Sequence, residues 1–291
     1  GDVIADAWEK EDITIGGKGT RGLGKIKNAK VDILEFSFTE QKEIDKWLDF
    51  DLYDDCAWIR YEKEFGCAVT ESVPEHYKRS IHLKLKLEQK GPLIIRSYTT
   101  KVKSEQGMPD YTQLAYMRKQ EKGEDSPKEI PVIPGTSWAG AFRHQMKQLD
   151  PDCIGQYFGE NAKQKSRITF GESEIVGAAD KLFTRNAIDR FTGGTVDNAL
   201  YTEKLCYGGH TELAIVVTPD KAAETFLQCL AAAIVDLHMG FLAIGGENAI
   251  GRGLFTLTEI LCQEEKLDIN LQEPDQIYEA LLGAMLDARK E

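Results

Sequence analysis

A glycine-rich loop occurs twice in this chain, once near each end. Residues 15–24 read Ile-Gly-Gly-Lys-Gly-Thr-Arg-Gly-Leu-Gly, and residues 244–253 read Ile-Gly-Gly-Glu-Asn-Ala-Ile-Gly-Arg-Gly. The isoleucine and four glycines fall in register, each copy holds an arginine, and strand-like sequence follows both. Spaced glycines allow positive φ angles and close approach of the backbone to a ligand, and successive N–H groups form an anion-binding nest. The repeat therefore predicts one complete module and the tail of an earlier one, each ending in a phosphate-sized loop.

Two ordinary glycine turns are the alternative interpretation, and a dinucleotide-binding fingerprint is a further one. That fingerprint needs a strand before the glycines and a helix after them. Here the order is reversed, since an apolar helical run over 222–239 precedes the second loop and a strand follows it. The P-loop pattern of lysine followed by serine or threonine is also missing, because Lys18 is followed by Gly19. The sequence therefore disfavours a nucleotide-cofactor site.

The hydrophobic pattern upstream of the second loop predicts elements in the order βαββαβ. Ile81, Leu83, Leu85 and Leu87 alternate with polar residues, as is typical of a half-buried strand. A threonine or serine N-cap after Pro-Gly opens a helix over 134–146. The order predicts an α+β, ferredoxin-like fold with the four-stranded sheet of RNA-recognition modules. The remaining elements are a strand over 166–175, an inserted irregular hairpin over 181–210, a strand over 212–217, a helix over 220–239, a strand over 254–261 and an amphipathic helix over 274–289.

These elements divide the chain into four segments, the first of which is cut short. Because the chain begins at Gly1, inside a module, we expect further sequence upstream. A polar stretch over 97–130 is too long for a passive connection and predicts a functional or disordered loop. The segments are a remnant of a preceding module over 1–38, closed by a strand over 28–38; an acidic connector over 39–77, with a short helix over 40–49; a complete module over 78–262; and a C-terminal helical tail over 263–291.

Charge is distributed unevenly along a chain whose net charge is −12. Between Lys78 and Ser104, eight lysines and arginines accompany one acidic residue, Glu88. This stretch predicts a local basic face that binds a polyanion, with Lys84 and Lys86 on the polar side of the first strand. A solvated strand face is the alternative. The chain has no run of eighteen apolar residues, no recognisable signal peptide and six scattered cysteines, so we expect a cytoplasmic protein with free thiols and no membrane partner.

Three motifs resemble the RAMP superfamily of CRISPR-associated proteins. Residues 133–143 read Ile-Pro-Gly-Thr-Ser-Trp-Ala-Gly-Ala-Phe-Arg, similar to the family's Ile-Pro-Gly-Ser-Ser-Leu-Lys-Gly-Ala-Leu-Arg. Residues 185–194 read Arg-Asn-Ala-Ile-Asp-Arg-Phe-Thr-Gly-Gly and resemble a hairpin "thumb" that reaches between nucleotides; the glycine loop is the third motif. The likeness is greatest to backbone subunits of type III antiviral effector complexes. It implies guide (CRISPR) RNA, target RNA and other RAMP modules or effector subunits as partners.

The resemblance implies a set of RNA-binding residues. The N–H groups of Thr136, Ser137 and Trp138 would face a phosphate at the positive end of a helix, although the family's lysine is replaced by Ala139. Trp138 is more typical of a core residue, and Arg143 could equally be a surface arginine. In the hairpin, two arginines would clamp a backbone while Phe191 or Val196 enters between bases; an ordinary exposed hairpin is the alternative. The implied RNA-binding residues are Gly135, Thr136, Ser137, Arg143, Arg185, Arg190, Gly245, Gly246, Gly251, Arg252 and Gly253, together with Lys84 and Lys86 from the charge pattern.

Cleavage of target RNA is a further implication of the resemblance. Family members that cut RNA use a loop aspartate with a divalent metal, and Asp110 in Gly-Met-Pro-Asp is the best match, with Asp125 as the alternative. The cofactor would be Mg²⁺, and the sequence identifies no further metal ligand. Three other functions stay open: a structural RNA-binding module without catalysis, an endoribonuclease that processes precursor guide RNA through His82 or His144, and an unrelated ferredoxin-like protein that binds another protein.

Overall fold

The structure is a computed structural model that describes residues 16, 38–50, 80–97, 109–118, 128–159, 166–219 and 223–290. The chain divides into two compact units, residues 1–15 with 25–78, and residues 16–24 with 79–291, and each is described by itself. The upstream glycine loop apart from Gly16, the predicted strand before residue 38 and Asp125 lie outside the described residues.

In the first unit, the described element is helix α2 (Gln41–Asp49), which confirms the short helix predicted over 40–49. The ring of Phe38 packs edge-on against Trp47, with 5.4 Å between the ring centroids.

The second unit is built around strand β1 (Ile81–Gln89), which pairs antiparallel with β9 (His210–Val217) on one side and β10 (Phe255–Cys262) on the other. The predicted alternation along β1 is confirmed, because Ile81, Leu83, Leu85 and Leu87 are all buried. Leu85 lies opposite Leu213 of β9 and Ile260 of β10, so the three strands direct apolar side chains to one face of the sheet.

Further strands extend the sheet on both sides. The predicted strand over 166–175 is two strands, β5 (Ile168–Phe170) and β6 (Ser173–Val176), which pair with different parts of β9. The loop predicted over 97–130 is wrong in part, since β3 (Ala115–Arg118) and β4 (Lys128–Ile133) form an antiparallel pair at the sheet edge. Strand β4 was not predicted because it contains Pro131, and a proline within a strand pattern argues against a strand. The strand order is β11 (Glu265–Lys266), β10, β1, β9, β6, β4 and β3.

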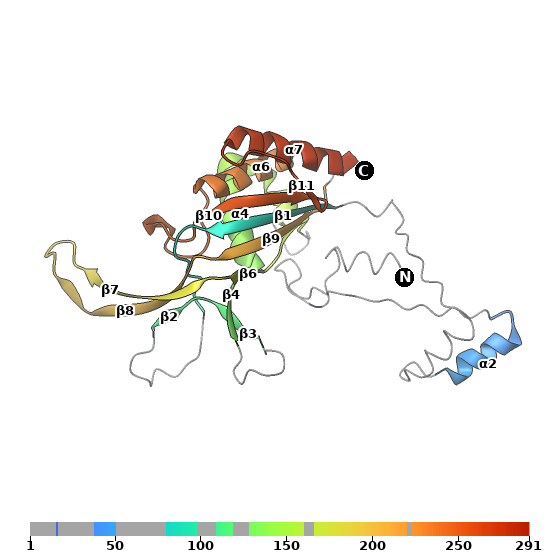
Figure 1. The fold of residues 1–291 in the computed structure, drawn as a ribbon, viewed down its shortest axis with the longest axis horizontal. Helices are drawn as coiled ribbons and strands as arrows, with labels where there is room; N and C mark the ends of the chain where they lie inside the picture. Colours follow the sequence, from blue (N-terminus) through green and yellow to red (C-terminus); the bar gives the residue numbers. More distant parts are fainter. Residues whose placement is uncertain are drawn as a thin grey trace. The chain divides into compact units, whose positions relative to one another are not determined.

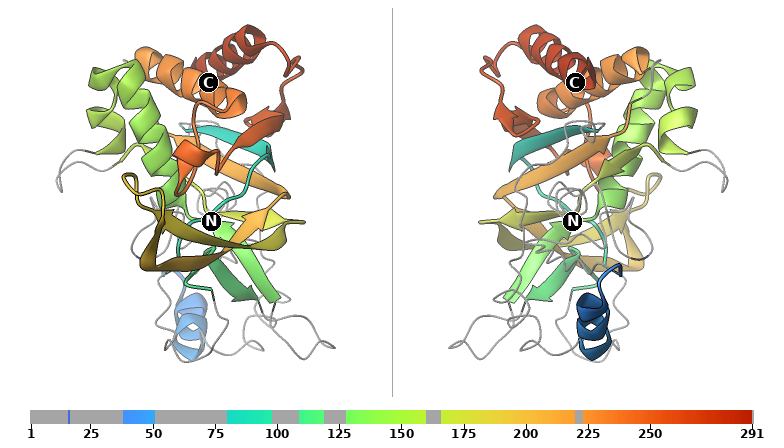
Figure 2. Two further views of the ribbon diagram at one scale, coloured as in Figure 1. Left: turned by 90° about the vertical axis from the view of Figure 1, so that its left-hand side faces the viewer. Right: turned by 90° about the vertical axis from the view of Figure 1, so that its right-hand side faces the viewer.

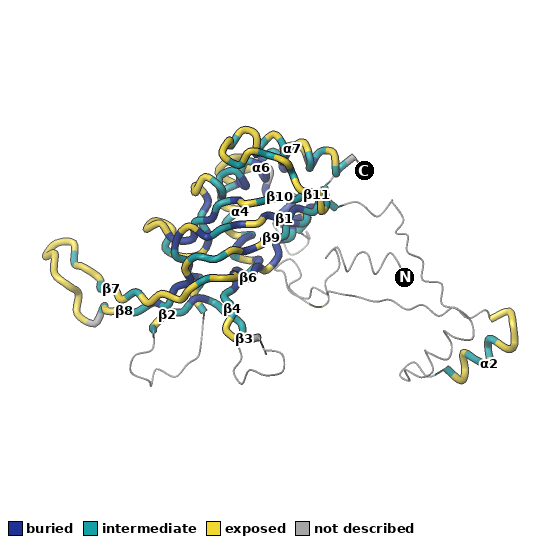
Figure 3. The backbone as a smooth tube through the Cα atoms, viewed as in Figure 1, coloured by how far each residue is buried: buried dark blue, intermediate teal, exposed yellow. Residues whose placement is uncertain are grey.

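Three helices cover the apolar face of the sheet, as Figure 2 shows. They are α4 (Gly135–Leu149), α6 (Glu224–Met239) and α7 (Pro274–Lys290), and each contributes buried side chains to one core (Figure 3). The predicted α+β class is confirmed, and the strands of the main sheet pair antiparallel. Among the described residues, no helix is both long and apolar enough to cross a membrane. Short helical turns complete the unit: η3 (Pro151–Cys153), α5 (Gly155–Phe158) and η4 (Asn248–Ile250).

The inserted hairpin is a long two-stranded ribbon rather than an irregular excursion, with a shift in register between Asn186 and Ile188. Strand β7 (Ala179–Ile188) pairs antiparallel with β8 (Thr195–Tyr207), and the ribbon projects from the body of the unit (Figure 1). Strand β2 (Tyr111–Thr112) pairs in parallel with β8, so the hairpin belongs to a second, three-stranded sheet.

Candidate nucleic-acid interface

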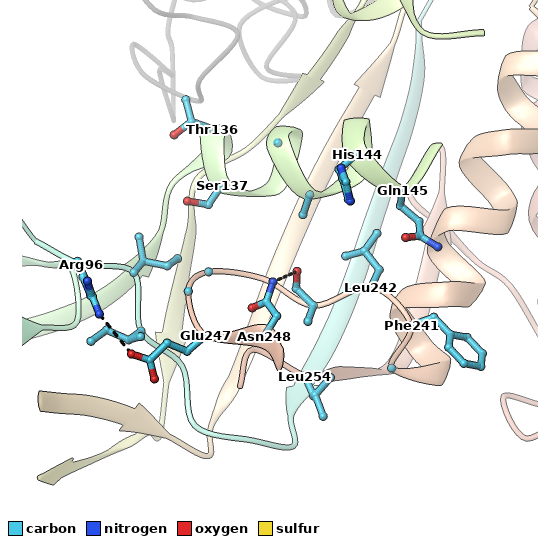
Figure 4. A pocket seen from close by; sticks show the side chains of 18 of the residues that line it. Arg96, Thr136, Ser137, His144, Gln145, Phe241, Leu242, Glu247, Asn248 and Leu254 are labelled. Carbon is cyan, nitrogen blue, oxygen red and sulfur yellow. Dashed lines mark hydrogen bonds and ion pairs between the residues drawn. The ribbon is translucent and has the colours of Figure 1, made fainter. Parts of the chain in front are cut away.

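A groove of about 940 Å³ lies between α4, residues 94–96 and the glycine loop that follows α6 (Figure 4). We call it the α4 groove. Its α4 wall presents one stripe of the helix, and the opposite wall is backbone-rich loop. The lining residues are Ile94, Ile95, Arg96, Thr136, Ser137, Gly140, Ala141, His144, Gln145, Gln148, Gly240, Phe241, Leu242, Ala243, Gly245, Gly246, Glu247, Asn248 and Leu254.

The start of α4 differs from its prediction. The N-cap is Pro134, in the extended region at φ −62° and ψ 146°, and no side chain caps the helix, so the predicted threonine or serine cap is wrong. Gly135 is instead the first helical residue, and the Pro134 carbonyl accepts hydrogen bonds from the N–H groups of Ser137 (2.9 Å) and Trp138 (3.3 Å). Those two N–H groups therefore belong to the first helical turn. Among the described residues, none accepts a hydrogen bond from the N–H of Gly135 or Thr136.

The side chains of Trp138 and Arg143, which belong to the same motif, have different environments. Trp138 is fully buried and its indole Nε1 donates to the Ser173 hydroxyl at 3.1 Å, which confirms the core interpretation. Arg143 is exposed and is not among the residues that line the α4 groove. Its contact with RNA stays a prediction.

The glycine loop has the positive φ angles expected, at Gly245 (+87°), Gly251 (+81°) and Gly253 (+72°). At Gly245 and Gly253 the nearest neighbour is the chain's own backbone, whereas a Cβ on Gly251 would meet open space. A Cβ on Gly245 would lie 2.7 Å from the Ile94 carbonyl oxygen, and one on Gly253 would lie 1.8 Å from that of Ile244. The loop is tied to the segment after β1, because Gly246 N–H donates to the Ile94 carbonyl at 2.9 Å and Gly253 N–H to that of Pro92 at 2.8 Å. The glycines therefore fix one wall of the groove.

The upstream copy of the loop is described at one position. Gly16, which aligns with Gly245, also has a positive φ, +91° against +87°. Both aligned glycines therefore lie in the left-handed region of φ that favours glycine.

A cluster of two arginines and two glutamates joins the groove to the hairpin. Arg252 is 1% exposed, with Nη2 2.9 Å from Glu203 Oε2 and Nη1 2.7 Å from Glu247 Oε2, at angles outside those of hydrogen bonds. Arg96 lies 3.2 Å from Glu247 and 3.6 Å from Glu203, and its guanidinium sits 4.1 Å from the ring centroid of Tyr111. Glu203 belongs to β8 and Glu247 to the glycine loop. Arg96, Tyr111 and Glu247 are not among the RNA-binding or catalytic residues that the sequence predicted.

The tip of the hairpin is ordered by Asp189. Its Oδ1 accepts hydrogen bonds from the N–H groups of Phe191 (2.7 Å) and Thr192 (2.9 Å). The bond from Thr192 and then that from Phe191 lower the pKa of this carboxyl. Phe191 is fully exposed at the tip, and Arg190 beside it is exposed. The tip thus presents an aromatic ring and a cation to solvent, while Arg185, further down β7, is half-buried.

The candidate catalytic residue Asp110 forms two hydrogen bonds with the hairpin strand β8. Its N–H donates to the Thr202 carbonyl at 2.7 Å, and its Oδ2 accepts from the Thr202 N–H at 2.8 Å. The residue is exposed just before β2. Among the described residues, no group of three or more His, Cys, Asp or Glu side chains could hold a metal ion.

The lysines predicted to form a basic face each lie beside a carboxylate. Lys84 Nζ is 2.8 Å from Glu264, and Lys86 Nζ is 2.5 Å from Glu259, which also pairs with Lys266. The Glu259 hydrogen bond raises the pKa of Lys86, and the bonds from Lys86 and Lys266 lower the pKa of Glu259 to about 2. This part of the sheet face is therefore charge-balanced rather than basic. His82 lies on the same strand face, whereas His144 lines the α4 groove.

Residues 86–256 match the model of the RAMP superfamily. The chain belongs to the RAMP superfamily. The matched region contains α4, the hairpin and the glycine loop, and therefore every wall of the α4 groove. No curated protein matches the sequence. Membership of the RAMP superfamily indicates a CRISPR-associated, RNA-binding role in assembly with other CRISPR proteins.

Proposed function

We propose that this RAMP protein is a guide-RNA-binding subunit or segment of a type III antiviral effector complex. The observation that carries the proposal is the convergence of the start of α4, the glycine loop and, through the Glu203 cluster, the base of the hairpin. These three segments are distant in sequence: the first two hold the Ile-Pro-Gly and glycine-loop motifs, and the hairpin carries the third motif, residues 185–194, toward its tip. We also propose that β1, α4, β5 with β6, β9, α6 and β10 form a ferredoxin-like core, because β10–β1–β9–β5 are neighbours in that order.

The groove suits a single strand of RNA better than a folded duplex. A phosphate beside Thr136 and Ser137 would lie at the positive end of α4, within reach of two hydroxyl groups. Further along, the exposed ring of Phe191 can stack on or between bases, and Arg185 and Arg190 can contact the backbone on either side of it. The outer face of β1, by contrast, carries paired charges and no Phe, Tyr or Trp, so we place the RNA in the groove and not on the sheet.

The test is the salt dependence of RNA binding by the full chain. For a single strand, the logarithm of the association constant should fall with the logarithm of salt concentration by about 0.7 for each phosphate contact. Arg190→Ala should lower that slope by about 0.7. Lys147→Ala, an exposed α4 residue outside the groove lining, is the control and should leave the slope unchanged. RNA binding that is absent or independent of salt would instead support a protein-binding function.

Cleavage of bound target RNA by Asp110 is the second part of the proposal. Oδ2 already accepts a hydrogen bond from Thr202, and Oδ1 has no hydrogen-bond partner among the described residues. Mg²⁺ commonly takes one or two carboxylates together with substrate phosphates and waters, so Asp110 fits a metal that binds with RNA. When bound, the metal would supply charge stabilisation at the phosphate under attack. The chain itself holds the Asp110 carboxylate in a fixed position beside β8 through the two hydrogen bonds to Thr202.

Two substitutions separate catalysis from structure at this position. Asp110→Asn keeps an oxygen that can accept the Thr202 N–H, whereas Asp110→Ala removes the acceptor. If Asp110 is catalytic, both variants lower the cleavage rate in the full effector complex with matched RNA and magnesium by about a hundredfold or more. If Asp110→Asn cleaves at the wild-type rate, Asp110 only positions the hairpin and the chain is a structural RNA-binding module.

A further inference from the structure

Arg96 and Arg252 share the same two carboxylates but differ in what else can reach them. Arg252 is 1% exposed and its two Nη atoms lie within 2.9 Å of Glu203 and Glu247. A ligand could contact this guanidinium only after the glycine loop had separated from the hairpin. Arg96 is 46% exposed, lies farther from both carboxylates, and lines the α4 groove.

The Arg96 guanidinium is oriented without being enclosed. Tyr111 supports one face of it at 4.1 Å, and Glu247 accepts one hydrogen bond at 3.2 Å, as the dashed line in Figure 4 shows. Stacking on an aromatic ring is a geometry that suits the planar guanidinium and leaves its edge donors available. The Arg96 side chain is half-exposed, so water screens its ion pairs and they contribute little to stability. Arg96 can therefore exchange a carboxylate contact for a phosphate contact at small cost to the fold.

Glu203 does not depend on Arg96 for its charge compensation. Its carboxylate is fully buried, and the nearer guanidinium is that of Arg252, at 2.9 Å against 3.6 Å for Arg96. If Arg96 turns toward a ligand, Glu203 and Glu247 both keep a close cation. Arg252 thus compensates the charge of the two glutamates inside the cluster, and Arg96 faces the α4 groove.

We propose that Arg96, and not Arg252, is the arginine of this groove that binds an RNA phosphate. The inference rests on the proposed RNA-binding function. Arg96, Thr136 and Ser137 line the same groove from different segments of the chain (Figure 4), so a phosphate bound among them would meet a guanidinium as well as the positive end of α4. A guanidinium can hold two phosphate oxygens with parallel N–H donors, which fixes the strand as well as attracting it.

The experiment compares Arg96→Met, Arg96→Lys and Lys147→Met in the full chain, with a labelled single-stranded RNA as the probe. Arg96→Met should bind about tenfold more weakly, as expected for loss of a hydrogen bond to a charged group, and should lower the salt slope by about 0.7. Arg96→Lys retains the charge without the planar fork, so it should keep the slope and bind more weakly. Lys147→Met, outside the groove lining, should match the wild type.

The outcomes separate this inference from the proposed function. If the wild type binds RNA and Arg96→Met binds equally well with the same slope, the Arg96 assignment is wrong while RNA binding stands. If Arg96→Lys lowers the salt slope by as much as Arg96→Met does, the effect is structural and the assignment is again overturned. If the wild type shows no salt-dependent RNA binding, the proposed function itself fails. Thermal unfolding of each variant checks that the fold is retained.

Discussion

Replacing Arg252 with methionine should destabilise the fold far more than the same change at Arg96. In Arg252→Met, the buried carboxylate of Glu203 keeps only Arg96 as a cation, at 3.6 Å and from a half-exposed side chain. Removing one partner of a buried ion pair costs about 3–5 kcal/mol, because the remaining charge is buried without compensation. In Arg96→Met, both glutamates keep Arg252, and loss of the longer contacts from a half-exposed guanidinium costs about 1 kcal/mol or less.

Urea unfolding measures this difference directly. A loss of about 3–5 kcal/mol is a large part of the total stability of a domain, roughly 5–15 kcal/mol, so the midpoint should move strongly while the slope with denaturant is unchanged. Methionine keeps much of the aliphatic volume of arginine, so a cavity contributes little to the comparison. If the two variants lose equal stability, or Arg96→Met loses more, burial does not decide the cost and the reasoning fails.

A second substitution tests the cause. Adding Glu203→Gln to Arg252→Met removes the uncompensated charge and should recover most of the lost stability, since replacing both members of a buried pair is often close to neutral. The double-mutant cycle gives the coupling energy between the two side chains. A double variant that is no more stable than Arg252→Met would show that the lost contact is packing and not charge.

Three further predictions concern single residues. Gly140→Ala and Gly283→Ala each add a methyl group to a helix at a position where nothing lies within 4 Å, so each should raise the free energy of unfolding by about 0.5–1 kcal/mol. Gly140 lines the α4 groove and Gly283 does not, so only Gly140→Ala should weaken RNA binding. Gly253→Ala should destabilise strongly in the same unfolding assay, because its Cβ would lie 1.8 Å from the Ile244 carbonyl oxygen. Because two backbone hydrogen bonds lower the pKa of Asp189 in the folded protein, its contribution to stability is present above the ordinary pKa of an aspartate and is lost as pH falls through the lowered pKa; the tip amide resonances should follow that titration in the wild type and not in Asp189→Asn.

The elements with strong periodicity were predictable from sequence. Alternation along β1 and the long apolar run of α6 each identify one element without reference to the rest of the chain, because burial on one face imposes the period. The hairpin was identified through its motif, whereas α4 was predicted from its helical spacing and a side-chain N-cap, of which the cap is wrong. Strand β4 was missed, since Pro131 interrupts the pattern that a strand would show and its partner β3 is only four residues long.

The electrostatic environment of the candidate site was not predictable from local sequence. Lys86 looks unpaired within its own strand, but Glu259 is brought beside it by pairing of β1 with β10. Arg252 follows a glycine in a loop and resembles a ligand-binding arginine, yet Glu203, nearly fifty residues upstream, neutralises it in the folded chain. The sequence identifies which segments carry charge, and only the tertiary pairing determines which charges remain available to a ligand.

The buried carboxylate of Glu203 has a mechanical consequence for the hairpin. Because β8 carries Glu203 and the glycine loop carries Arg252, the ribbon cannot swing away from the groove wall without opening a desolvated ion pair. Asp110, bonded twice to Thr202, adds a second anchor one residue away. The hairpin would therefore keep a constant distance between the α4 groove and Phe191. The number of RNA nucleotides between these two contacts would then be fixed by the fold of the protein.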